Sequence, residues 1–341
     1  MVETTMAVRA AGTTGRAAEA AAGAVEAVVG GAGQAVSDLV EIAGTLARNA
    51  LGRAAVLAAR TPGAGPVLGF VLRWLATVVS AAFGLVATAV LALADLVAGI
   101  VAGTIRLVGG GITGALARDA RMARRGLGDI ASSIAGSAVL LAGTALALVQ
   151  AVAFMQRGER ALTERERGQL RQVFRGSVAL HNVRVVIGFA GLFSVNKRPF
   201  TLGNTIYLKG YDPVAELDTL VHECTHVWQF QNAGVRYAAD ALWAQASIPK
   251  LGAYAWEEEP KRGRRRWQDF NREAQAQLVQ ELWQLGRLAT ASRSDAGAFY
   301  TNDPVGQDAC FVKDTTDHTP LAVQCAAALR AVAPWRLSAR L

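Results

Sequence analysis

Two histidines and a glutamate stand close together in residues 221–231, whose sequence is VHECTHVWQFQ. His222 and His226 are four residues apart, so on an α-helix their imidazoles lie one turn apart on one face and can bind a single metal ion. Glu223 directly follows the first histidine. In such an H-E-x-x-H motif the histidines bind zinc, and the glutamate takes a proton from a water molecule that the metal activates. The motif therefore predicts zinc-dependent hydrolysis.

The residues around the motif predict that it lies on a helix. Asp212 followed by Pro213 is typical of a helix start, and Gly234 is typical of the position just after a helix end. Between them, apolar residues recur at three- and four-residue spacing: Leu217, Leu220, Val221, Cys224 and Trp228. The alternative is a helix whose histidines are ordinary, partly buried polar residues.

Catalytic zinc usually has three protein ligands, so one ligand is still to be found. The longer motif H-E-x-x-H-x-x-G-x-x-H is excluded, because Gln229 and Asn232 occupy its last two defined positions. Residues 267–288 predict a second helix with an apolar stripe, and Glu273 lies in its first half. We therefore expect Glu273 to be the third ligand. The alternatives are Asp240, Glu257, Glu258, Glu259, Asp269 and His318.

Several segments together resemble one protein family. They are NVRVVIGF, RPFTLGNTIYL, LDTLVHECTHVWQFQ and FNREAQAQLV, with Tyr254 and Trp256 before the last. Over residues 158–285 the chain resembles the zincin-type, gluzincin-like HExxH metallopeptidase domain found with contractile injection systems and Vgr-related proteins. The resemblance implies Zn²⁺ held by His222, His226 and Glu273, with Glu223 as general base. It also implies an α+β zincin-like fold, a peptide or protein substrate, and a link to secretion or contractile injection machinery.

Other signals subdivide the predicted catalytic region, residues 158–341. Thr163 with Glu166 three residues later is a capping box, so a helix is expected to begin there. Residues 183–186 and 205–208 read as strands, and in zincin folds a strand beside the active-site helix binds an extended peptide by edge pairing. The charged run after Glu259, KRGRRRW, is expected to be a solvated loop.

Three further residues are candidates for stabilising an oxyanion, and the sequence does not rank them: Tyr237, Tyr254 and His318. It also leaves open whether Cys310 and Cys325 form a disulfide, because spacing alone does not show pairing.

The N-terminal half of the chain is apolar and is expected to be helical. Of the 341 residues 52% are hydrophobic, and the excess lies before residue 157. Residues 1–60 are rich in alanine and glycine and predict a helical or flexible segment. Residues 61–157 contain two uncharged runs, about 74–94 and 131–154, each long enough to span a bilayer. We expect transmembrane segments there; the alternative is helices buried in a soluble bundle or against a partner protein.

The charge of the chain indicates where the protein is expected to act rather than which reaction it catalyses. Residues 96–105 extend the first apolar run, and a loop with Arg106 and other arginines is expected before the second. The net charge of +8 suits an anionic membrane surface, and no nucleic-acid-binding motif is visible. No secretory signal peptide is visible either. We expect a membrane-associated protein of the cell envelope, or one that a secretion system delivers.

Two other classes of function fit the same sequence. A zincin-like domain that binds zinc but has lost activity would be a structural module, anchored to a membrane or secretion apparatus by the apolar half. A membrane-permeabilising toxin would use residues 1–157 for the damage itself. The metallopeptidase hypothesis rests on the helix spacing together with the family pattern.

Overall fold

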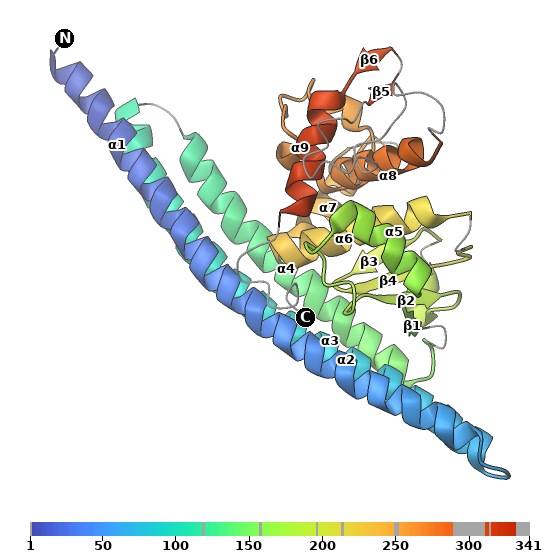
Figure 1. Ribbon diagram of the computed structural model, residues 1–341. Helices are drawn as coiled ribbons and strands as arrows, with labels where there is room; N and C mark the ends of the chain where they lie inside the picture. Colours follow the sequence, from blue (N-terminus) through green and yellow to red (C-terminus); the bar gives the residue numbers. More distant parts are fainter. Residues whose placement is uncertain are drawn as a thin grey trace.

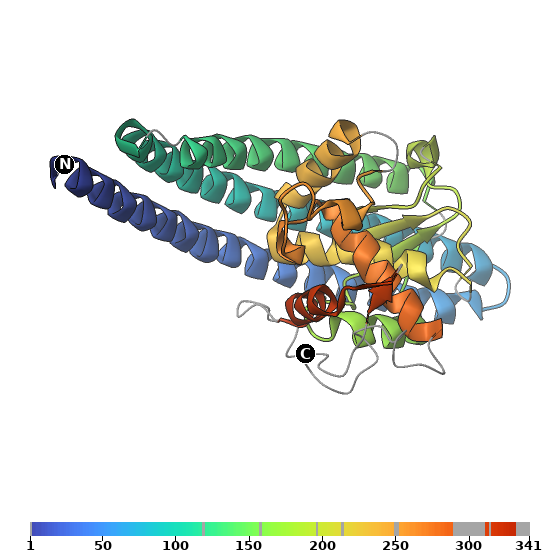
Figure 2. The same cartoon turned by 90° about the horizontal axis from the view of Figure 1, so that it is seen from above.

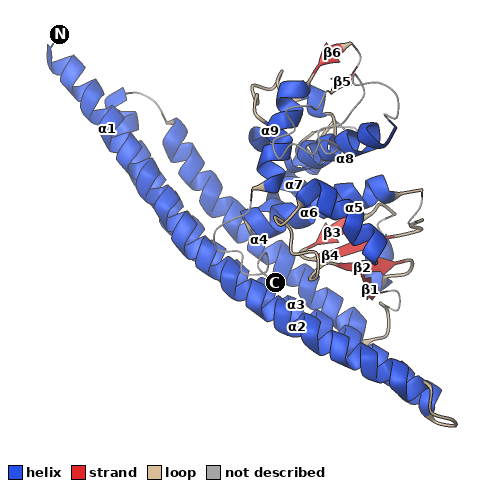
Figure 3. Ribbon diagram, in the orientation of Figure 1, coloured by secondary structure: helices blue, strands red, loops and turns tan. Residues whose placement is uncertain are grey.

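The computed structural model describes residues 2–117, 120–156, 159–195, 197–212, 215–248, 252–288, 311–313 and 315–331. The fold is mostly helical α+β, with long N-terminal helices and a small mixed sheet (Figure 1, Figure 3). Cys310 lies outside the described residues, and Cys325 is buried and free.

Three long helical rods form the N-terminal half. The first contains α1 (Val2–Val25), the π-helix η1 (Glu26–Gly30) and α2 (Gly31–Ala59). The second rod is α3 (Gly65–Ala117), and the third is α4 (Arg121–Val152). α3 contacts both of the others, which run antiparallel to it (Figure 1). The Ala/Gly-rich N-terminal segment is therefore helical, and α3 alone extends for about 80 Å at ~1.5 Å per residue.

Two of the rods are long and apolar enough to cross a membrane, over Gly65–Ile112 and Arg121–Val152. Length and composition alone do not separate a membrane span from the core helix of a soluble protein. The expected span at 74–94 lies inside α3, and that at 131–154 lies in α4 except for its last two residues, which follow the helix end at Val152. No break separates residues 96–105 from the first span. Membrane insertion therefore stays a prediction.

Close approach between the rods explains why their sequence is rich in glycine. A Cβ atom built on Gly103 would lie 2.6 Å from the backbone oxygen of Gly126, and a Cβ on Gly126 would lie 2.4 Å from the oxygen of Gly103. Both distances are shorter than real Cβ contacts, so α3 and α4 can approach this closely only because both residues are glycine. The glycines serve packing at this crossing rather than flexibility.

An ion-pair network joins the rods to the rest of the molecule. Arg106 was expected in a loop, but it lies inside α3 and is largely buried, because its guanidinium pairs with Glu19, Glu26 and Asp129 at 3.0, 2.9 and 2.7 Å. Arg236, from α7 (Arg236–Ser247), pairs with Glu26 at 3.1 Å and with Asp129 at 3.4 Å. These shared carboxylates connect all three rods with α7.

The sheet has four short strands in the order β1-β2-β4-β3. They are β1 (Glu159–Ala161), β2 (Arg184–Ile187), β3 (Phe200–Leu202) and β4 (Thr205–Leu208). β2 and β4 are parallel, with Val186 opposite Tyr207, while β1 and β3 pair antiparallel at the two edges. The two strands expected from sequence are confirmed to within one residue.

Both faces of the sheet are covered. One face, with Val185 and Ile206, packs into a core with α5 (Glu164–Phe174), α6 (Leu217–Ala233), α8 (Arg272–Leu288) and α9 (Thr319–Arg330). The other face, with Val186 and Tyr207, packs against Leu91 of α3 and Leu140 of α4. The far ends of the rods extend away from this globular part (Figure 1, Figure 2). The rods and the sheet therefore share a core.

Short elements complete the described chain. They are the 3-10 helices η2 (Gly191–Val195), η3 (Trp256–Glu258) and η4 (Trp267–Asp269), and the two-stranded sheet of β5 (Val312–Lys313) and β6 (Thr316–Asp317). The predicted capping box is confirmed, because the Thr163 hydroxyl accepts from the Glu166 backbone and the Glu166 carboxylate accepts from the Thr163 backbone. Helix α6 ends at Gly234, as expected, but it begins at Leu217, four to five residues after the predicted start.

Gly234 also marks the point where the globular part meets α3. Its φ of 70° and ψ of −156° fall in a region that glycine alone adopts readily. The next backbone N–H, of Val235, donates to the Asp95 carboxylate at 2.6 Å, and a Cβ on Gly234 would lie 1.9 Å from that carboxylate. The turn between α6 and α7 thus needs glycine both for its backbone and for the approach of Asp95.

We predict that Gly234→Ala lowers the free energy of unfolding by about 1–3 kcal/mol or more, because it adds both backbone strain and a clash with Asp95. Urea denaturation followed by circular dichroism measures this. Gly168→Ala is the control: Gly168 lies in α5 with open space around its Cβ position, so alanine there should stabilise by up to about 1 kcal/mol. Equal effects of the two substitutions would contradict the role given to Gly234.

Candidate metal centre

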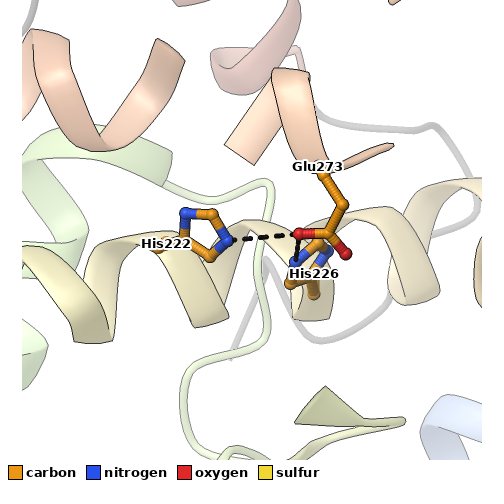
Figure 4. Close-up of side chains that lie close together, drawn as sticks. All are labelled: His222, His226 and Glu273. Atoms are coloured by element: carbon orange, nitrogen blue, oxygen red, sulfur yellow. Dashed lines mark ion pairs between the residues drawn. The ribbon is translucent and has the colours of Figure 1, made fainter. Parts of the chain in front are cut away.

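His222, His226 and Glu273 meet where α6 crosses α8, as Figure 4 shows. The Nε2 atom of His222 lies 3.5 Å from Oε2 of Glu273, and that of His226 lies 3.4 Å from the same oxygen. All three ligand atoms lie within 4.8 Å of one another, and all three residues are buried. The structure therefore brings together the three residues that the sequence predicts as ligands, and they form a possible metal site.

The separations between these atoms fit zinc. Zinc binds imidazole nitrogen and carboxylate oxygen at ~2.0–2.1 Å, so two ligand atoms at a tetrahedral angle lie about 3.3–3.4 Å apart. The observed 3.4 and 3.5 Å agree with that spacing and exceed the 2.7–3.2 Å usual for N–H···O hydrogen bonds. The donor set of two imidazoles and one carboxylate also matches catalytic zinc sites. The residues present thus fit a zinc ion, and its binding stays a prediction.

Neighbouring glutamines fix which nitrogen of each histidine faces the site. Nδ1 of His222 lies 3.0 Å from Oε1 of Gln280, whose Nε2 donates to the Asp218 carboxylate at 2.9 Å. A carboxylate only accepts hydrogen bonds, so the orientation of the Gln280 amide is set and its oxygen must face His222. Nδ1 of His222 therefore carries the proton, and Nε2 keeps a free electron pair for a metal.

His226 is oriented in the same way. Its Nδ1 lies 2.8 Å from Oε1 of Gln229, and Nε2 of Gln229 donates to the backbone oxygen of Arg272 at 3.0 Å and to Oε1 of Gln275 at 2.9 Å. Because the backbone oxygen only accepts, the Gln229 oxygen must face the histidine. The buried Gln229 thus sets the orientation of the His226 ring and joins α6 to the start of α8.

Glu273 is held from two sides. Gln245 of α7 donates to Oε1 at 2.7 Å, which leaves Oε2 facing the histidines. Glu273 lies in the first turn of α8, which begins at Arg272 rather than at the predicted residue 267. The Asn271 side chain accepts from the backbone N–H of Glu273 at 3.0 Å and so caps this helix.

A buried carboxylate positions that cap. Glu259 accepts from the backbone and the side chain of Asn271 at 2.9 and 3.0 Å, and from Arg262 and Arg264 at 2.7 Å each. Its side chain is fully buried. The expected solvated loop is confirmed, since Lys261, Arg265 and Arg266 are exposed, although Arg262 and Arg264 also fold back to neutralise the buried Glu259. Those contacts hold the pKa of Glu259 below its ordinary value of 4.5, although burial acts in the opposite direction.

Electrostatics within the site are strong. Burial would raise the pKa of Glu273, but His226 and His222 outweigh it and hold that pKa well below its ordinary value. Burial would lower the pKa of His226, but Glu273, Glu223 and Gln229 raise it to about 9. At neutral pH His226 therefore holds a proton that a metal ion would have to displace on binding.

Glu223 lies beside the three ligands without joining them. Its side chain is buried, and the Thr201 hydroxyl of β3 lies 2.8 Å from its Oε2 and 3.0 Å from its backbone oxygen. Burial raises the pKa of Glu223, although the two histidines and Thr201 act against it. A carboxylate whose pKa lies nearer neutrality is a better general base than an exposed one.

A cleft of about 590 Å³ opens next to these residues. Its walls include His222, Glu223, Tyr254 and Arg198, the last of which forms a hydrogen bond with Tyr254. The rings of Tyr254 and His222 are 6.0 Å apart. Burial, with the charge of Glu273, raises the pKa of Tyr254 to about 12, so its hydroxyl keeps its proton at neutral pH.

The other candidate residues have structural partners elsewhere. Tyr237 is buried, accepts from the backbone N–H of Gly203, and does not line the cleft. His318 packs edge-on against Trp256 at the start of α9. The remaining carboxylates considered as third ligand also form ion pairs: Asp240 with Arg272, Glu257 with Lys313, Glu258 with Lys261 and Asp269 with Arg266.

Comparison with protein-family models, with curated proteins and with solved structures finds no match for this chain. What the structure supports is a buried group of two histidines and a glutamate on α6 and α8, consistent with a zincin-like site. The family resemblance read from the sequence stays a prediction.

We predict that Gln280→Ala weakens zinc binding by about 10–100-fold, because it removes the group that orients His222. Competition with a fluorescent zinc indicator measures the affinity. Gln277→Ala is the matched control: Gln277 also lines the cleft from α8, but its side chain contacts Glu281 and not a ligand. Unchanged affinity in Gln280→Ala would show that His222 needs no such support.

We predict that Glu259→Gln lowers the free energy of unfolding at pH 7 by about 2–3 kcal/mol, because two arginines lose a buried charged acceptor. The folded pKa is lowered, so this stabilisation is full above pH 4.5 and is lost as the pH falls through the lower folded value. Urea denaturation of both proteins as a function of pH measures the difference, which should shrink in acid.

The neighbouring substitution Glu258→Gln is the control for Glu259. The side chain of Glu258 is 45% exposed and pairs with the exposed Lys261, so its loss should cost less than about 1 kcal/mol. A Glu259→Gln protein as stable as Glu258→Gln at neutral pH would contradict the role of Glu259.

Proposed function

We propose that the chain is a zinc-dependent metallopeptidase that hydrolyses peptide bonds. The observation that carries this proposal is the convergence of His222, His226 and Glu273 on one point, with Glu223 beside it and an open cleft in front. The chemistry that zinc supplies when bound at such a site is Lewis-acid activation of a water molecule and of a carbonyl group.

The protein's own residues have separate tasks in this mechanism. His222, His226 and Glu273 would hold the metal, each oriented by a glutamine. Glu223 would accept a proton from the attacking water and pass it to the leaving amine. Thr201 supports this by fixing the Glu223 carboxylate at 2.8 Å. Because Glu223 is buried, its pKa is raised, which makes it a stronger base than an exposed carboxylate.

Tyr254 is the best candidate for stabilising the oxyanion of the tetrahedral intermediate. It lines the cleft beside His222, whereas Tyr237 and His318 do not. Its raised pKa keeps a proton available for donation, and its hydrogen bond to Arg198 places a positive charge nearby.

The position of β3 supports an extended peptide as the substrate. β3 is an edge strand whose one described strand partner is β4, and it contacts α6 next to the motif. Pro199, just before β3, and Arg198 line the cleft. The Tyr237 hydroxyl already bonds the Thr201 oxygen and the Gly203 N–H, so a peptide would pair with this edge before Thr201, and its backbone hydrogen bonds would supply affinity. An association with contractile injection or secretion machinery rests on the sequence resemblance alone.

We predict that Glu223→Gln retains zinc and loses hydrolysis of fluorescein-labelled casein by about 10²–10⁴-fold, the usual contribution of a general base. Metal content by plasma mass spectrometry and the rate of peptide release are measured on the same full-length protein. Glu257→Gln is the control, since Glu257 lines the same cleft but pairs with Lys313.

Three outcomes are informative. Unchanged hydrolysis in Glu223→Gln would exclude Glu223 as the base. Zinc bound by the wild type without any cleavage of casein would favour a structural zinc module. Absence of zinc from the wild type after reconstitution would overturn the metallopeptidase proposal.

A further inference from the structure

A second cavity, larger than the metal cleft, lies between the rods and the edge of the sheet. Its volume is about 840 Å³, and α2, α3, the end of α4 and β1 all contribute to its wall. Among their lining residues the two cavities have none in common. The volume lies within the ~300–1,000 Å³ typical of pockets that bind small molecules.

One wall of this cavity is a fixed stack of aromatic rings. Phe154 stacks on Trp74 at 4.7 Å and lies parallel to Phe70 at 5.9 Å. The Trp74 indole donates to the backbone oxygen of Ala151 at 3.1 Å, which holds its ring in place. Phe154 takes a φ of 60°, a strained conformation for a bulky residue, and so directs its ring to Trp74.

Arginines of α2 and α3 bring positive charge to the cavity. Arg48, Arg53 and Arg73 line the cavity, and none of them forms an ion pair with a residue that the structure describes. Arg53 and Arg73 are exposed at the rim, and Arg48 is half-buried. Arginines gathered without partners beside an apolar wall are typical of a site for an anion.

One acidic residue, Glu159, also lines the cavity. Its Oε1 is buried and has no hydrogen-bond partner among the described residues. Burial raises the pKa of Glu159 against the charges of Arg184 and Arg48, so it offsets less positive charge than an exposed glutamate would.

The surface beside the cavity is apolar. Val56 and Leu57 of its wall are 52% and 65% exposed, and Val67 and Leu68 in the first turn of α3 are 67% and 51% exposed. An apolar wall that opens onto an exposed apolar surface suits a hydrocarbon chain better than a soluble ion.

We propose that this cavity binds an amphiphile with one anionic head group and an acyl chain. The head group pairs with Arg53 and Arg73 at the rim, and the chain lies along Phe70, Trp74 and Phe154. The ligand is either a free fatty acid or an anionic lipid of a bilayer, which share this chemistry. The site works independently of the metal centre.

Titration calorimetry of the full-length protein with laurate, below the concentration at which laurate aggregates, tests this proposal. We expect one laurate per chain and at least tenfold weaker binding of dodecanol, which lacks the charge. Arg53→Gln combined with Arg73→Gln should weaken laurate binding at least tenfold. Phe70→Gln, at a half-exposed position, should weaken it without unfolding the protein.

Arg60→Gln combined with Arg165→Gln is the matched control, because both arginines are exposed, lie outside the cavity and remove the same charge. It should leave laurate binding unchanged. Co-sedimentation with phosphatidylglycerol and phosphatidylcholine vesicles distinguishes the two sources of ligand. Binding of laurate identifies a free amphiphile, and binding confined to phosphatidylglycerol vesicles, with the same response to the variants, identifies a bilayer lipid.

Three results would overturn the proposal. One is that neither laurate nor anionic vesicles bind. Another is equal weakening by the two arginine pairs, which would show a general charge effect. The third is tighter binding of ATP than of laurate, which would assign the cavity to a soluble anion.

Discussion

The structure depends on the burial of four titratable side chains at one helix crossing. His222, Glu223, His226 and Glu273 all lie in the contact between α6, α8 and β3. Buried charge is costly unless it is paired and hydrogen-bonded, so each of these groups needs a partner of its own. The partners outside the group are neutral amides and a hydroxyl, which orient these side chains, while within the group Glu273 pairs with both histidines. A metal cation bound at this point would take the place of the proton that His226 holds.

The rods contribute to the site through the elements that they hold. Asp95 of α3 fixes the turn at Val235, from which α7 begins, and Arg236 ties the first residue of α7 to Glu26 and Asp129. α7 in turn carries Gln245, which orients Glu273. On the other side, Leu91 and Leu140 cover the face of the sheet opposite α6. The apolar half is therefore part of the framework of the metal centre.

Spacing in the sequence predicts the two histidines because an α-helix has a fixed period. Glu273 also follows from local pattern, since it occurs in a well-marked amphipathic helix. Gln280 and Gln245, which orient His222 and Glu273, carry no such signal, because their contacts join segments far apart in the chain. Charge alone misplaces Arg106, which stands in a stretch expected to be a loop and is buried because carboxylates on α1, η1 and α4 neutralise it.

Because the rods and the sheet are packed against each other, only part of the surface of the long helices can contact a membrane. Lipid cannot surround the part of α3 near Leu91 while that part covers the sheet, since the two would occupy the same space. Asp95 and Arg106 would in addition lose their partners, and hydrocarbon has no polar groups to replace them. With the fold intact, membrane contact is therefore confined to apolar surface that the globular part leaves open. The end of α2 and the start of α3, where Leu57 and Val67 are exposed, form such a surface beside the arginine-lined cavity.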